Sequence, residues 1–100
     1  MSSKEIAKRN DLLRRSIPNI FHPNLLVLTR GVADLGQEEV KEILKIVKEF
    51  NVFTKDNDPW KEHDFGAFNY KGKKIFWKID DYAGNEGYEL VLTILLAEEY

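Results

Sequence analysis

Hydrophobic residues between positions 35 and 50 recur at intervals of three and four, which is the spacing of one face of an α-helix. Two acidic residues, Glu38 and Glu39, stand where they favour the start of a helix, and Gly36 is a suitable cap just before them. We therefore predict an amphipathic helix from about Gly36, with a buried face made of Val40, Ile43, Leu44, Val47 and Phe50.

A weaker helical pattern covers residues 3–16 and ends before Pro18. Its apolar stripe is thin, and cations occupy the opposite side of the helix. We expect residues 1–17 to form a basic helix that packs loosely, as an arm, with Arg14 and Arg15 either gripping an acidic partner or facing water. The stripe consists of Ile6, Asn10, Leu13 and Ile17.

Residues 65–70 and 73–80 alternate between hydrophobic and polar on either side of Lys71-Gly72, which predicts a β-hairpin with a two-residue loop. That loop fixes the register, so Gly66 lies opposite Trp77 and His63 lies opposite Asp80. Gly66 then leaves room for the Trp77 indole. The core side of the hairpin carries Phe68, Ile75, Trp77 and Ile79.

Two other segments complete the predicted fold. A short apolar run at residues 24–29 indicates a buried strand, and residues 88–100 fit either a strand or a helix, with length and the Leu-Leu-Ala-Glu-Glu ending favouring a helix. The predicted fold is α+β, in the order helix, strand, helix, strand, strand, helix. A small, mainly antiparallel sheet of about three strands has helices packed on one face.

Composition narrows the class of protein. One hundred residues, 43% of them hydrophobic, suit one domain over residues 1–100 with one core. The chain has no cysteine, no apolar amino-terminal run and no apolar stretch of the ~20 residues that a membrane span needs, so we expect a cytoplasmic protein. Its net charge of −2 makes direct binding of duplex nucleic acid unfavourable.

Residues 54–66 contain four carboxylates and one of the two histidines around Pro59 and Trp60. Like charges crowded into one turn repel one another unless a cation or a partner offsets them. Folding alone explains this composition poorly, so we take the segment as the candidate functional site. Its charged residues are Asp56, Asp58, Glu62, His63 and Asp64, besides Lys55 and Lys61.

Several blocks along residues 25–100 resemble, in order, a bacterial family named only as domain of unknown function 3768. The resemblance implies no known activity, and because the family is often carried on mobile elements it implies a role in transfer, maintenance or evasion of host defence. The chain departs from the family pattern at Lys55, where proline is usual, and in a shorter link at residues 83–89. The matching blocks are Leu28–Val32, Leu35-Gly36, Phe53-Thr54, Asp56–Pro59, Glu62–Gly66, Phe76–Asp80, Leu92–Ile94, Leu96-Ala97 and Glu99-Tyr100.

Two kinds of chemistry are conceivable at the mouth of the hairpin. Glu62, Asp64 and Asp80 offer oxygen ligands for Mg²⁺, Mn²⁺ or Ca²⁺, although side chains of successive strand residues point in opposite directions. His63 oriented by Asp80 offers general acid–base catalysis, but no nucleophile motif or phosphate-binding loop accompanies it. A structural His63–Asp80 hydrogen bond is the simpler interpretation. We therefore expect no cofactor.

The preferred function is a non-enzymatic binding protein that inhibits a host defence protein, of the anti-CRISPR or anti-restriction type, through an acidic surface. Trp60 either folds onto the core or serves as an exposed anchor, and an acidic turn with such an anchor suits a partner with a basic surface. The alternatives are a small metal-dependent hydrolase or nuclease, and an accessory or scaffold dimer joined through Leu90–Leu96; the chain itself is a monomer or a homodimer. Candidate partner-binding residues are Asp56, Asp58, Trp60, Glu62 and Asp81.

Overall fold

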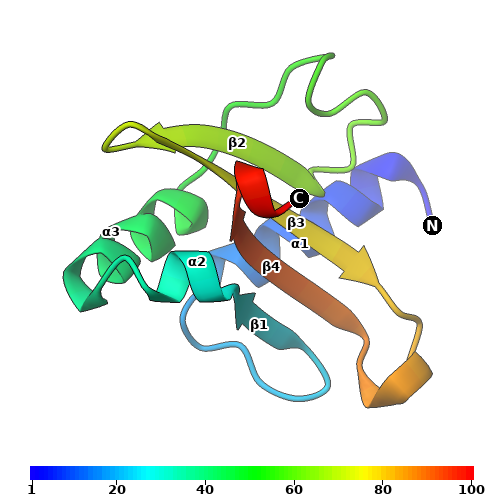
Figure 1. Cartoon of the computed structure of the whole chain (residues 1–100). Helices are drawn as coiled ribbons and strands as arrows, with labels where there is room; N and C mark the ends of the chain where they lie inside the picture. Colours follow the sequence, from blue (N-terminus) through cyan, green and yellow to red (C-terminus); the bar gives the residue numbers. More distant parts are fainter.

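The computed structural model describes residues 1–100 as a sheet with three helices on one of its faces (Figure 1). None of these helices combines the length and the apolar character needed to cross a bilayer. The elements are α1 (Ser3–Arg15), β1 (Leu25–Leu28), α2 (Arg30–Ala33), α3 (Gln37–Lys48), β2 (Phe65–Tyr70), β3 (Lys73–Asp81), β4 (Leu90–Leu96) and the short 3-10 helices η1 (Asn85–Gly87) and η2 (Ala97–Glu99).

The sheet has four strands in the order β1-β4-β3-β2, rather than about three. β1 runs parallel to β4, and the other neighbours are antiparallel, so the α+β class is confirmed. The fourth strand is β4, which we expected to be a helix. Strand pairing decides its structure, because β4 lies between β1 and β3 and its backbone groups find partners on both sides.

The hairpin has the predicted register, with Gly66 paired to Trp77 and Tyr70 paired to Lys73. Its core side was also predicted correctly for Ile75 and Trp77, both fully buried. A Cβ on Gly66 would lie 2.2 Å from Nε1 of Trp77, so the indole occupies the space that the glycine leaves.

Helix α1 is not a loosely packed arm. A capping box formed by Ser2 and Glu5 fixes its start, and its inner side contributes Leu13 to the main core. Two polar residues of that side, Asn10 and Arg14, are each only 1% exposed. The stripe looked thin in the sequence because half of what the helix buries is polar.

The chain ends on the face of the sheet opposite the helices, where η2 crosses β3 (Figure 1). The carboxylate of Glu99 accepts hydrogen bonds from the Thr29 hydroxyl at 2.6 Å, from the Leu96 amide at 2.8 Å and from the Gly31 amide at 3.0 Å. The Thr29 hydroxyl is the main cause of the lowered pKa of Glu99, with the two amides adding to it. These bonds fasten the carboxyl-terminal residues to the start of α2.

Candidate functional site

A buried arginine lies beneath the candidate site. Arg14 of α1 donates hydrogen bonds to the carbonyl oxygens of Phe50, at 2.6 Å, and Val47, at 3.2 Å, where α3 ends and its last carbonyl groups lack the partners of a continuing helix. It also donates to Asp11 at 2.6 Å, and its guanidinium lies 5.0 Å from the ring centre of Trp77. Burial lowers the pKa of Arg14, and the bond to Asp11 opposes that change. Arg14 therefore ties α1 to the end of α3.

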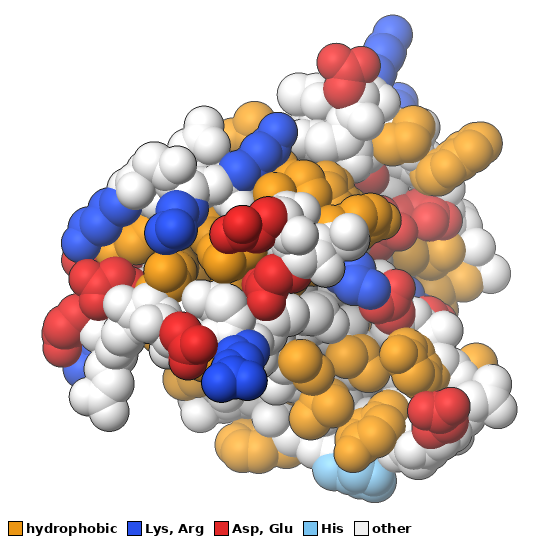
Figure 2. Space-filling model, viewed as in Figure 1, with side chains coloured by type: hydrophobic (Ala, Val, Ile, Leu, Met, Phe, Trp, Pro, Cys, Tyr) orange, Lys and Arg blue, Asp and Glu red, His pale blue; other side chains and the backbone are white.

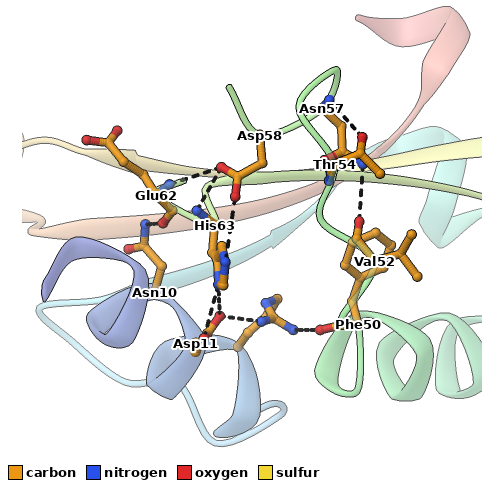
Figure 3. A network of polar contacts seen from close by, with 10 residues as sticks. Asn10, Asp11, Phe50, Val52, Thr54, Asn57, Asp58, Glu62 and His63 are labelled. Carbon is orange, nitrogen blue, oxygen red and sulfur yellow. Dashed lines mark hydrogen bonds and ion pairs between the residues drawn. The ribbon is translucent and has the colours of Figure 1, made fainter. Parts of the chain in front are cut away.

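Asp11 extends this tie to the histidine of the candidate site (Figure 3). His63 Nδ1 lies 3.0 and 3.1 Å from the two oxygens of Asp11, and since an ionised carboxylate only accepts, Nδ1 carries the proton. The imidazole stacks on Phe53, with ring centres 3.8 Å apart and planes 3° apart. Its Nε2 lies 3.6 Å from the carboxylate of Asp58. The imidazole thus sits between two carboxylates and against one aromatic ring.

Asp58 completes the chain of contacts from inside the turn. Its carboxylate accepts hydrogen bonds from the backbone N–H groups of Glu62 and His63, both at 3.0 Å, and the residue is only 5% exposed. Lys61 and His63 have positive φ angles of 56° and 54°, a backbone conformation that residues other than glycine rarely adopt. The two bonds to Asp58 offset the cost of that backbone conformation.

Other bonds fasten the rest of the turn. The amide of Asn57 donates to the carbonyl oxygen of Val52 at 3.2 Å, and its side-chain oxygen accepts from the Thr54 N–H at 3.0 Å. On the far side, the buried amide of Asn10 donates to the Glu62 carbonyl at 2.9 Å. We refer to residues 54–63 as the Trp60 turn, and to Arg14, Asp11, His63 and Asp58 as the anchoring network.

Trp60 lies on the outer side of this fastened turn. It is 75% exposed, so it does not fold onto the core as a lid. Asp56 is also exposed. Asp58, which we expected at the binding surface, is buried and serves the backbone of the turn instead. The exposed charged residues at the outer part of the turn are therefore two lysines, Lys55 and Lys61, and one acid, Asp56.

The acidic surface lies beside the turn, at the end of β3. Glu62, Asp64, Asp80 and Asp81 line one hollow of about 420 Å³, which we call the acidic hollow; red side chains mark this region on the right of Figure 2. Arg9 of α1 lies at its rim and pairs with Asp81 at 2.9 Å. Burial raises the pKa of Asp64, and the nearby charges of Asp58 and Asp80 raise it further.

The predicted pair of His63 and Asp80 does not form. His63 has a positive φ and lies just before β2, which begins at Phe65, so it is not part of the strand and its ring turns toward Asp11 of α1. Asp80 pairs instead with Lys78 at 3.0 Å. Glu62, Asp64 and Asp80 line one hollow but are not close enough together to share a metal ion, and no other group of three such side chains is. The structure thus brings together neither the pair considered for catalysis nor the three carboxylates considered for a metal ion.

Sequence reasoning missed Asp11 and Arg14 as members of the site. A signal was present, because Asn10 interrupts an apolar stripe and Arg14 follows that stripe's Leu13 directly. A polar residue on the buried side of a helix must find a hydrogen-bonding partner, which for Asn10 lies 52 residues further along the chain.

The chain belongs to the family described as Protein of unknown function (DUF3768), whose sequence profile matches residues 28–90. This confirms the resemblance found in the sequence. No curated protein and no solved structure gives a significant match. The matched range includes the whole Trp60 turn and the four carboxylates of the acidic hollow, but it excludes α1, which supplies Asp11, Arg14 and part of the lining of the hollow.

Proposed function

We propose that this protein acts without catalysis, by binding a basic surface of a partner protein through Trp60 and the acidic hollow. The observation that carries the proposal is the 75% exposure of Trp60 on a turn that the anchoring network holds in place. Tryptophan is the side chain most enriched at the energetic centres of protein interfaces. A turn ordered before binding loses little conformational entropy on association, which favours affinity.

The acidic hollow supplies the complementary charge. Four carboxylates line it, and two of them already have a cationic partner: Arg9 pairs with Asp81 and Lys78 pairs with Asp80. A lysine or arginine of the partner inserted among Glu62, Asp64 and Asp80 forms charge-assisted hydrogen bonds in a partly desolvated place. Because burial raises the pKa of Asp64, this carboxyl takes up a proton at a higher pH than an ordinary aspartate does, and binding of the cation weakens as the pH falls.

The partner that fits these features is a nucleic-acid-binding protein, whose groove presents lysine and arginine to phosphates. Carboxylates placed in such a groove compete with the nucleic acid for the same cations. Within the bacterial cytoplasm, defence nucleases of the CRISPR and restriction systems have grooves of this kind, so we propose inhibition of a defence protein as the biological role. The family's implied association with mobile elements supports this choice.

Capture from a bacterial lysate on the immobilised protein, followed by titration of the purified partner, tests the proposal. Reversing charge in the acidic hollow with Glu62→Lys and Asp80→Lys should weaken binding at least ~10-fold, whereas Glu86→Lys, an exposed acid on η1, should leave binding nearly unchanged. Equal weakening by both changes would show a general charge effect, and unchanged binding in the hollow variants would refute the proposed surface.

A further inference from the structure

No α-helix covers the face of the sheet opposite α1, although Val91 and Leu95 on that face are only 7% and 5% exposed. The helices contribute Leu13, Val32 and Ile43 to the core on one side, while η2 alone crosses the other side. Strand register assigns residues to this second side, which we call the open face. It consists of Leu25 and Val27 on β1, Phe65, Ala67 and Asn69 on β2, Lys74, Phe76, Lys78 and Asp80 on β3, and Val91, Thr93 and Leu95 on β4.

The open face is largely apolar. Phe65 and Phe76 lie with ring centres 5.1 Å apart, and Tyr100, 78% exposed, packs edge-on against Phe76. Figure 2 shows hydrophobic side chains over β1 and β4 and again around η2 on the side toward the viewer. A sheet with one solvated face normally alternates apolar and polar residues along each strand. β4 has Leu-Val-Leu-Thr-Ile-Leu-Leu instead, which is typical of a strand covered on both faces.

The charges on this face complement each other within one strand. Lys78 and Asp80 lie two residues apart on β3 and pair at 3.0 Å, so the middle of the face is neutral. A neutral patch gives no preference for a strongly charged partner. When the same patch meets itself about a two-fold axis, Lys78 of each copy can face Asp80 of the other, which makes the patch self-complementary.

We infer that the open face binds a second copy of this chain, forming a two-fold symmetric dimer in which two sheets pack face to face. Four strands spaced ~4.8 Å apart and about seven residues long give a face of roughly 400 Å² on each copy, by the dimensions of ordinary sheets. With the Tyr100 rings at the rim, the pair buries on the order of 1,000 Å² in total, at the lower limit of specific interfaces. The dimer is therefore weak and forms at micromolar or higher concentration. The Trp60 turn is not part of this interface.

Sedimentation velocity over a concentration series tests the dimer. The mass should rise from 11.7 kDa toward twice that value with concentration. Phe65→Glu should weaken association at least ~10-fold by burying a charge within the interface, on its edge strand β2. Its fold should persist, since Phe65 pairs with Lys78 across the strands and a glutamate there gains an opposite charge. Leu12→Glu on α1 is the matched control, because Leu12 is 59% exposed on the helical side.

Charge exchange gives a second readout. Asp80→Lys alone should weaken the dimer, and adding Lys78→Asp should restore it, because the exchanged pair is again self-complementary. A wild-type chain that stays monomeric at ~0.5 mM, a concentration at which such weak interfaces are populated, would overturn the inference. So would a Phe65→Glu variant that associates as well as the wild type.

Discussion

Replacing Arg14 by methionine should be among the most damaging single changes in the protein. Methionine keeps the apolar contact with Trp77 but leaves the carbonyl oxygen of Phe50 without a donor, and it removes one of the donors to the Val47 carbonyl and to the carboxylate of Asp11. Breaking a buried ion pair by removing one partner costs about 3–5 kcal/mol. A domain of this size is stabilised by only about 5–15 kcal/mol, so the variant should fold but unfold at a much lower urea concentration.

The assay is urea unfolding followed by circular dichroism, with Arg15→Met as the control. Arg15 is the next residue of the same helix and is exposed, so its replacement should change the free energy of unfolding by less than about 0.5 kcal/mol. In an Asp11→Asn background, Arg14→Met should cost about 1–3 kcal/mol less than in the wild type, because the two residues act as a pair. If the free energies of unfolding of the Arg14→Met and Arg15→Met variants differ by less than about 1 kcal/mol, Arg14 does not have the stabilising role described, because measurement error and ordinary surface effects account for a difference of that size.

Three further changes probe other parts of the structure. Gly66→Ala should destabilise the fold by about 1–3 kcal/mol in the same assay, because its Cβ would lie 2.2 Å from Nε1 of Trp77. Asp64→Asn should stabilise the fold at pH 7 but not below pH 3.8, the ordinary pKa of the carboxyl group. Because the pKa of Asp64 is raised in the folded state, the wild-type protein loses stability as the pH rises from 3.8 through that raised pKa. Melting curves at several pH values measure this difference. Glu99→Gln should destabilise the fold at pH 7. The lowered pKa of Glu99 means that its carboxylate stabilises the folded state above the ordinary pKa of 4.5, and this contribution is lost as the pH falls through the pKa of the folded state.

Local patterns were sufficient for most of the fold. Helix α3 and the hairpin of β2 and β3 follow from hydrophobic spacing and one two-residue loop, because both depend on neighbours in the sequence. β4 could not be predicted in the same way. Its leucines suit helix and strand alike, and the deciding interactions are the ladders with β1 and β3, whose partners are far away along the chain.

The sequence singled out residues 54–66 as the candidate site, but it did not predict the contacts that these residues make in the structure. The crowded charges at residues 54–66 did require an explanation, and the structure supplies one for two of them: Asp58 accepts backbone bonds, and His63 lies between Asp58 and Asp11. The third partner, Asp11, lies 52 residues earlier on α1, so no spacing rule could connect it to His63. The sequence also did not decide whether Trp60 is buried or exposed, because tryptophan is common both in cores and at interfaces.

The central claim is that the exposed indole of Trp60 anchors a protein partner. The most direct measurement compares the dissociation constants of the partner complex for Trp60→Ala and Phe21→Ala. The two side chains are 75% and 74% exposed, so neither change should disturb the fold. If Trp60 is the anchor, its removal weakens binding by about 30-fold or more, equivalent to about 2 kcal/mol, while the Phe21 variant binds like the wild type. Affinities within about two-fold of each other for the two variants would contradict the claim, since anchors of this class lose far more than that on truncation.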